Sequence, residues 1–357
     1  MIKRIFFKTF LLTLVAVIMF SCARQLSNST LPTDLVIFPP PPDTTRVQYL
    51  TSINTSFDIK GKQSVFNKFL FGEEVSKPLI KPYGVTVKDE KIYICDTGLG
   101  GLVCMDLSEK SFDYFIPNGK GQLQFPINCY VDESGYLFIA DGNRRQIVVF
   151  NAELEYVSEF GESSENFKPT DLSVLEDRIY VASVKDQLVY IYDKESFQLI
   201  KKFPSMEPGD DGYLYQPTNL FVDQNGVYVS DMGDNKIKIY SHDGMYQRFV
   251  GGYGNYAGQL MRPKGIVVDN SSNIFIVDAA FENVQIFNRE GKVLMFFGGP
   301  YKRHGDMWLP ADVTISYSGF EHFIEYVDES FNLKYLIFVT NQYGPEKVSV
   351  YGFVEPK

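Results

Sequence analysis

The sequence predicts an all-β fold, a six-bladed β-propeller of four-stranded antiparallel blades. Three observations predict it. A proline-anchored segment recurs at Pro82, Pro126, Pro169, Pro217, Pro263 and Pro310, in steps of 44, 43, 48, 46 and 47 residues. Each repeat continues as short apolar runs separated by turns rich in Asp, Asn and Gly. Aromatic residues make up 15% of the chain, and this composition favours strands over helices.

Each repeat is predicted to contain four consecutive strands. Proline has no N–H to donate to a sheet, so it opens the first strand, as in "PKGIVVD" at Pro263. A second strand, "IFIVD", ends at Asp278, and "NVQIFN" and "KVLMFFGG" follow after polar turns. Strands that are apolar on both faces must be covered on both sides. Sheets stacked face to face around an axis meet this requirement, with a usual period of about 40–50 residues.

The last repeat ends at Lys357 without a fourth strand. The segment "RVQYLTSI", residues 46–53, precedes the first proline and is expected to supply the missing strand. The N-terminal strand would then close the last blade and remove the open edge of the ring. Two insertions, residues 64–72 and 319–331, carry aromatics at helical spacing, which predicts short helices on the propeller edge.

The first 21 residues have the pattern of an export signal. Lys3, Arg4 and Lys8 precede an apolar run over residues 10–20, and Cys22 follows Ser21. This end resembles a bacterial lipobox, which implies a lipoprotein signal peptide over residues 1–21 and lipidation of Cys22. An ordinary signal peptide is the alternative. By resemblance to Gram-negative lipoproteins, the residue after Cys22, Ala23, implies anchoring in the outer membrane, facing either the periplasm or the surface.

Residues 22–45 contain four consecutive prolines, 39–42, and are predicted to form a stiff linker after Cys22. The propeller is then expected over residues 46–357. The full chain has a formal net charge of −10, which becomes −13 once residues 1–21, with three positive and no negative charges, are removed. Such an acidic chain is not expected to bind nucleic acid, and a basic or neutral partner is favoured.

The fourth and fifth repeats carry a family resemblance. "PKGIVVDNSSNIFIVD" and "DMGDNKIKIYSHDG" resemble the NHL-repeat propellers, and the resemblance extends over about residues 46–353. It implies a propeller fold, in which the turn that holds Arg144 and Arg145 often binds partners in this family. The third and sixth repeats depart from the pattern, with Ser183 and Asn341 where the other repeats have Asp. These motifs specify a fold more than an activity.

Polar residues replace glycine around the expected channel. Two residues after the prolines stand Gly84, Asn128, Asp171, Asn219, Gly265 and Asp312. Asn128, Asp171, Asn219 and Asp312 therefore form a candidate binding site at the channel mouth, and their oxygens suit a divalent cation such as calcium. Propeller lactonases, which this chain resembles in architecture, hold a metal in such a channel. The competing interpretation is that these side chains only bond their own backbone, so that no cofactor is bound.

Other candidate residues do not form a catalytic set. Asp96, Asp141, Asp231 and Asp278 recur after the second strand, with Ser183 and Asn341 completing the set, which is typical of a scaffold. The NHL-like amidating lyases use histidines to hold zinc, but His242, His304 and His322 fall outside the inner strands. The sequence contains no zinc-type spacing and no nucleophile elbow. Cys95, Cys104 and Cys129 are compatible with free thiols or with a bridge.

The loops predict a binding function. Arg144, Arg145, Arg262 and Lys264 are expected on one face, as partner-binding positions. The sequence thus predicts a membrane-anchored, non-catalytic scaffold that binds another envelope protein. Resemblance to lipoproteins with a proline-rich entry suggests a multihaem cytochrome or a secretion component as the partner. The alternative is a metal-dependent enzyme, lactonase- or lyase-like, that uses Asp171, Asn219 and Asp312 at the channel mouth.

Overall fold

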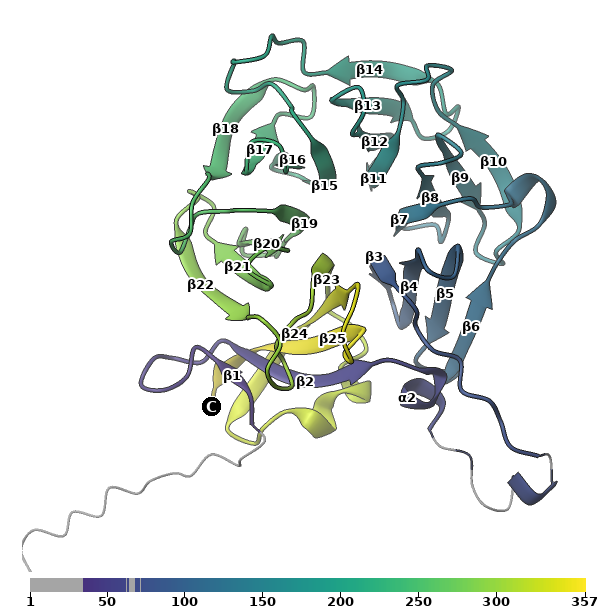
Figure 1. The fold of residues 1–357 in the computed structure, drawn as a ribbon, viewed down its shortest axis with the longest axis vertical. Coiled ribbons are helices and arrows are strands. Elements are labelled where there is room, and N and C mark those ends of the chain that lie inside the picture. The colour runs from purple at the N-terminus through teal and green to yellow at the C-terminus, as the bar shows by residue number, and fades with distance from the viewer. Residues whose placement is uncertain (1–34, 62, 64–67, 71) are drawn as a thin grey trace, which may run out of the picture. The chain divides into compact units, whose positions relative to one another are not determined.

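The computed structural model describes residues 35–61, 63, 68–70 and 72–357, so the signal peptide and Cys22 lie outside the described residues. Residues 36–357 form one compact unit, and it is the predicted six-bladed β-propeller (Figure 1). Across the described ranges, the helices are too short or too polar to cross a bilayer.

Five blades have four consecutive strands, and each first strand begins at the predicted proline. Blade one is β3 (Pro82–Lys88), β4 (Lys91–Asp96), β5 (Gly101–Asp106) and β6 (Ser111–Phe115). Blade two is β7 (Pro126–Val131), β8 (Leu137–Asp141), β9 (Gln146–Phe150) and β10 (Tyr156–Phe160). Blade three is β11 (Pro169–Leu175), β12 (Arg178–Ser183), β13 (Leu188–Asp193) and β14 (Leu199–Phe203). Blade four is β15 (Pro217–Asp223), β16 (Gly226–Asp231), β17 (Lys236–Tyr240) and β18 (Tyr246–Gly251). Blade five is β19 (Pro263–Val268), β20 (Ile274–Asp278), β21 (Asn283–Phe287) and β22 (Val293–Gly298).

The sixth blade joins the two ends of the chain, as the sequence predicts. It contains β23 (Pro310–Ser316), β24 (Phe331–Asn341), β25 (Val348–Pro356), β2 (Val47–Ile53) and β1 (Ile37–Phe38). β2 pairs antiparallel with β25, from Val47 opposite Phe353 to Ile53 opposite Val348. In Figure 1 the purple β2 lies against the yellow β25. The N-terminal strand therefore completes the last blade and so closes the ring of blades.

The propeller begins earlier than the sequence indicates. β1 lies in the segment that the sequence analysis assigns to the linker, and it pairs antiparallel with β2. Val36, Ile37 and Phe38 are buried in this blade because their apolar side chains complete its outer layer. Prolines 39–42 are therefore not a spacer. They lie in the loop of a hairpin in which the Arg46 N–H donates to the Phe38 carbonyl at 2.9 Å.

The helical elements are short and peripheral. Among the described residues they include α2 (Ser56–Lys60) and the 3₁₀ turns η1 (Gly119–Gly121), η2 (Phe320–His322) and η3 (Ile324–Tyr326). η2 and η3 confirm the helical character of the insertion in the last blade, and Phe323 between them packs into the core. The other insertion, residues 64–72, lies partly outside the described residues, and its described residues 68–70 are helical, as predicted.

The hydrophobic core is divided among the blade interfaces. Each of six buried clusters is shared by two neighbouring blades: one combines Phe138 and Val149 of blade two with Leu172 and Val181 of blade three. The middle strands are buried on both faces, as in β8 and β16. This burial explains why their sequences show continuous apolar runs rather than alternation.

Candidate functional site

The polar channel residues form a closely packed ring. Asn128, Asp171, Asn219 and Asp312 are all buried. A β-carbon on Gly84 would lie 2.6 Å from the Asn128 α-carbon, and one on Gly265 would lie 2.5 Å from the Asp312 α-carbon. In these two pairs the equivalent positions of neighbouring blades are in direct contact, and glycine stands where a β-carbon would not fit.

Two carboxylates of the ring join neighbouring blades. Asp171 accepts from its neighbour, the Leu172 N–H, at 2.8 Å, and from the Leu220 N–H of blade four at 2.9 Å. Asp312 accepts from the Val85 N–H at 3.0 Å and so links the last blade to the first. The bond between Asp171 and the adjacent Leu172 is expected if these side chains serve only their own backbone. The bonds to Leu220 and Val85 show that the two carboxylates also hold neighbouring blades together.

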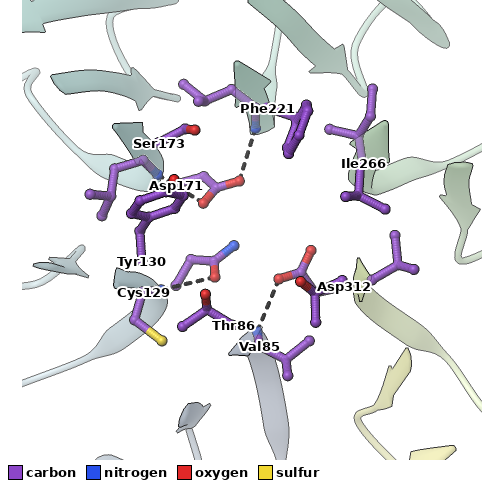
Figure 2. Close-up of a pocket in the computed structure, with 15 residues that line it drawn as sticks. Val85, Thr86, Cys129, Tyr130, Asp171, Ser173, Phe221, Ile266 and Asp312 are labelled. Atoms are coloured by element: carbon purple, nitrogen blue, oxygen red, sulfur yellow. Dashed lines mark hydrogen bonds between the residues drawn. The ribbon is translucent and has the colours of Figure 1, made fainter. Parts of the chain in front are cut away.

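The ring closes one end of a channel cavity of about 70 Å³. Asn128, Asp171 and Asp312 line it, with Thr86, Tyr130 and Ser173 further along the inner strands (Figure 2). In each inner strand, the described residues that line the cavity are the ring residue or residues that follow it in the sequence. The cavity therefore extends from the ring toward the turns that follow the inner strands. The cavity thus lies on the side of these residues away from the loop face, and their role in binding stays a prediction. Asn219 does not line the cavity, and its buried side-chain amide has no partner within the described chain.

Burial controls the charge of this cavity. Desolvation raises the pKa of Asp312 to about 7, although the Val85 and Val313 N–H groups act in the opposite direction. Desolvation also raises the pKa of Asp171 well above its ordinary value, and the negative charge of Asp312 adds to this rise. The cavity can therefore hold protons near neutral pH, or a cation that replaces them.

Lys264 is not the exposed partner-binding residue that the sequence predicts. It is buried, and its Nζ donates to the Tyr83 hydroxyl and lies 4.9 Å from the centre of that ring. The bond runs from blade five to blade one past the small Ala311 of blade six. Burial, followed by the charge of Arg262, lowers the pKa of Lys264 to about 8. Lys264 thus links blade five to blade one on the loop-face side of the channel residues.

Arg144 is also held inside its own blade. Its guanidinium donates to the carbonyls of Lys120 and Gln122 at 2.9 and 2.6 Å and to Glu159 at 2.8 Å. These bonds fix the loop before β7, so the side chain is not free for a partner. Arg145 and Arg262 are exposed, as expected.

The recurring Asp residues hold the loops that surround the mouth. Asp278, for example, accepts from the Met261 and Arg262 N–H groups at 2.7 and 3.1 Å, and from Ala280 and Phe281 at 2.9 and 3.2 Å. Asp96, Asp141 and Asp231 bind the preceding loops in the same way, while Ser183 and Asn341 each accept one such bond. These contacts agree with the scaffold role expected from the repeat.

The same contacts position a feature that the sequence reasoning missed. In five of six repeats an apolar residue one or two positions before the proline is 37–48% exposed on the loop face. These residues, here called the mouth ring, are Ile80, Phe125, Tyr215, Met261 and Trp308. The backbone N–H of each is bound by the recurring Asp or Asn. The recurrence of apolar residues inside polar loops was the available signal.

The histidines lie apart from the channel residues, and among the described cysteines only Cys129 lies beside them. His242 lies 2.7 Å from the Asp223 carbonyl, His304 lies 2.5 Å from Glu346, and His322 lies 3.3 Å from Glu90. The three described cysteines are free thiols, with Cys95 and Cys129 buried and Cys104 partly buried. Only Cys129 lines the channel cavity.

Comparison with known proteins supports the fold class. No protein-family model matches the chain, and no curated protein matches it. Among solved structures, virginiamycin B lyase from Staphylococcus aureus is 13% identical, with 84% of each chain covered and a TM-score of 0.53. A gluconolactonase from Xanthomonas campestris is 14% identical, with 88% of this chain and 91% of that chain covered and a TM-score of 0.55. A Bacteroides thetaiotaomicron protein of unknown function is 13% identical, with 86% and 76% covered and a TM-score of 0.61.

The protein is therefore a six-bladed propeller with structural neighbours among lyases and lactonases. At these identities the likeness concerns the fold alone. The NHL-repeat resemblance stays a prediction.

Proposed function

We propose that the propeller is a non-catalytic binding module of the cell envelope that docks a protein partner on its mouth ring. The observation that carries the proposal is the exposure of five apolar side chains around one end of the channel. Aromatic residues and methionine are enriched in the cores of protein interfaces, and three of the five are Phe, Tyr or Trp.

The loops present these side chains in a fixed arrangement. Each mouth-ring backbone is bound by a buried Asp or Asn that follows the second strand, as in the 2.7 Å bond from Ile80 to Asp96. A partner therefore meets a surface whose loops are already ordered, and less conformational entropy is lost on binding.

Charge beside the mouth ring indicates the kind of partner. Lys81, Lys168 and Arg262 come directly before three of the prolines, and Arg145 lies on the same face. A partner with an apolar patch bordered by acidic side chains complements this arrangement, which differs from the basic or neutral partner that net charge alone favours. The lipid anchor at Cys22, the outer-membrane location and a multihaem cytochrome or secretion component as partner belong to this proposal.

Site-specific photo-crosslinking in cells tests it. A photoreactive phenylalanine at position 308 should capture one discrete envelope protein, and Met261→Glu in the same chain should abolish that product. The control is position 200 on the outermost strand β14, where Ile200 is also exposed. A discrete product from position 200 and none from position 308 would sink the proposal.

A second candidate is catalysis in the channel cavity, because two carboxyl groups from opposite blades line it together. The donor set fits a hard cation such as calcium: Asp171, Asp312 and Asn128 offer carboxylate and amide oxygens, and Thr86 and Ser173 offer hydroxyls. Such a cation would polarise a substrate carbonyl when bound.

Metal analysis of the purified domain tests this candidate, followed by lactone hydrolysis assays on the Asp171→Ala, Asp312→Ala double variant. Bound calcium and an activity that the variant loses would support an enzyme. Neither result would change the crosslinking outcome, so the two functions are distinguishable.

A further inference from the structure

We propose that a groove on the loop side of blade five binds a neutral saccharide. The groove has a volume of about 370 Å³. Its walls are the rings of Tyr256, Phe281 and Phe296 with Pro300, and its polar groups include the amides of Asn283 and Gln285. This set is called the blade-five groove. It shares no residue with the mouth ring, so the inference does not depend on the proposed function.

The elements around the groove are fixed before any ligand binds. Tyr256 lies in the loop between β18 and β19, and this loop is tied to β21 by Gln285. The Gln285 amide donates to the Gln259 carbonyl at 2.8 Å and accepts from the Gly258 N–H at 2.9 Å. Pro300, on the opposite side, forms an isolated bridge with Met307. A preformed concave site of this size is typical of small-ligand binding.

The groove presents aromatic ring faces that pack against no other aromatic ring among the described residues. Tyr256 is 77% exposed and Phe296 is 51% exposed. Within the described part of the chain, neither ring nor that of Phe281 is paired with another aromatic ring, whereas Tyr301 and Trp308 nearby stack on each other at 6.1 Å. Exposed ring faces in a concave site gain most from a ligand that offers a flat apolar surface.

The polar lining selects for neutral ligands with hydroxyl groups. Among the described residues that line the groove there is no Asp, Glu, Lys, Arg or His, although charged residues make up 22% of the chain. The Asn283 side-chain oxygen is buried without a hydrogen-bond partner. A small rotation of this amide would present it to a ligand hydroxyl and satisfy it.

A pyranose ring has both properties. Its C–H face packs on an aromatic ring, and its hydroxyls both donate to and accept from planar amides. A proline-rich peptide also packs on aromatic rings, but each proline lacks the N–H donor that the Asn283 oxygen requires. The saccharide is therefore the better match.

Saturation-transfer NMR on the whole domain with cellobiose, maltose and diacetylchitobiose tests the proposal. At least one disaccharide should receive saturable transfer on its ring C–H protons. Tyr256→Ala and Phe296→Ala should each weaken that binding by about tenfold, because each removes a stacking face. Asn283→Ala should weaken it by about fivefold through the lost hydrogen bond.

Tyr253→Ala is the matched control. Tyr253 lies in the same loop and is 73% exposed but does not line the groove, so its loss should change the affinity by less than about twofold. The proposal is overturned if no disaccharide binds at millimolar concentration, or if Tyr253→Ala and Tyr256→Ala have equal effects. It is also overturned if a hexaproline peptide binds the groove and the disaccharides do not.

Discussion

At the scale of single residues, the channel ring shows that the neighbouring blade restricts which side chain a ring position can carry. Gly84 lies beside Asn128 and Gly265 beside Asp312, with no room for a β-carbon between them. The repeat alignment predicts that these positions are equivalent. It does not predict which of them keep glycine, because that depends on contacts between blades.

Replacing Gly265 with alanine should destabilise the domain by about 2–3 kcal/mol. The new β-carbon would meet backbone atoms, at 2.5 Å from the Asp312 α-carbon and 2.8 Å from the Val313 nitrogen, and backbone cannot move aside cheaply. Urea unfolding measures the change. Gly142→Ala is the control, since its β-carbon comes closest to the flexible end of Ile127, at 2.8 Å, and should cost under about 1 kcal/mol. Equal losses in both variants would contradict the explanation.

Asp312→Asn should weaken the pH dependence of stability. The folded pKa of about 7 lies above the unfolded value of about 4, so the folded protein keeps a proton that the unfolded chain releases. The free energy of unfolding therefore falls as the pH rises from about 4 to about 7. The amide cannot ionise and can still accept from Val85, so the variant should be more stable at pH 8 by on the order of 2 kcal/mol.

Urea unfolding at pH 5 and pH 8 checks this expectation. The gap between wild type and Asp312→Asn should be larger at pH 8 than at pH 5. Parallel curves at the two pH values would show that Asp312 is ionised in the folded protein at both.

Lys264→Met should raise the pKa of Asp312 further. The Lys264 charge favours the ionised form of Asp312, and methionine removes that charge while keeping most of the side-chain volume. Carbon-detected NMR titration of the Asp312 carboxyl measures the change. An unchanged titration midpoint would show that Lys264 acts on the channel only through its contact with Tyr83.

The position of Lys264 also marks a limit of sequence-based prediction. Its place directly after Pro263 suggests a surface residue, because lysine at a loop end is usually solvated. Its side chain is instead buried and bonds to Tyr83 of blade one, and the equivalent residue of the intervening blade six is the small Ala311. That contact arises only when three blades are assembled.

At the scale of elements, ring closure was predictable and its outer hairpin was not. The sixth repeat lacks a fourth strand, so the chain had to provide one, and β2 begins one residue after the predicted start. β1 has only two residues, too few to show alternation, and the four prolines after it resemble a spacer. Only pairing with β2 identifies it as a strand.

Two truncations separate the roles of β1 and β2. A domain that starts at residue 46 loses three buried apolar side chains and should remain a folded monomer, less stable by about 2–4 kcal/mol. A domain that starts at residue 54 also loses the pairing with β25, and this long exposed edge should make it unfold or associate. Circular dichroism melting and light scattering distinguish the outcomes. A monomer starting at residue 54 that melts like the parent would contradict ring closure.

At the scale of the whole molecule, the core is spread evenly over six blade interfaces. No interface is complete without both of its blades, so unfolding should be cooperative. The sequence predicts this organisation well, because the repeat fixes which strands are inner and which are outer. It predicts the channel cavity poorly, because the cavity depends on how side chains from several blades meet.

The thiols should report this cooperativity. Burial raises the pKa of Cys95 and of Cys104, so few thiolates are available in the folded domain. With Ellman's reagent, at most about one thiol, Cys104, should react quickly in the folded domain, and three should react in guanidinium. Fewer than three in guanidinium without reductant would reveal a disulfide.

The partnership of β2 with β25 has a consequence for biosynthesis. The two strands are separated by on the order of 300 residues, so during synthesis β2 stays without its partner until β25 has been translated. A product that stops before Val348 lacks β25, so the ring of blades stays open and β2 remains an exposed, aggregation-prone edge strand. Such a fragment is a target for chaperones and proteases, so survival of the protein should depend on the synthesis of β25.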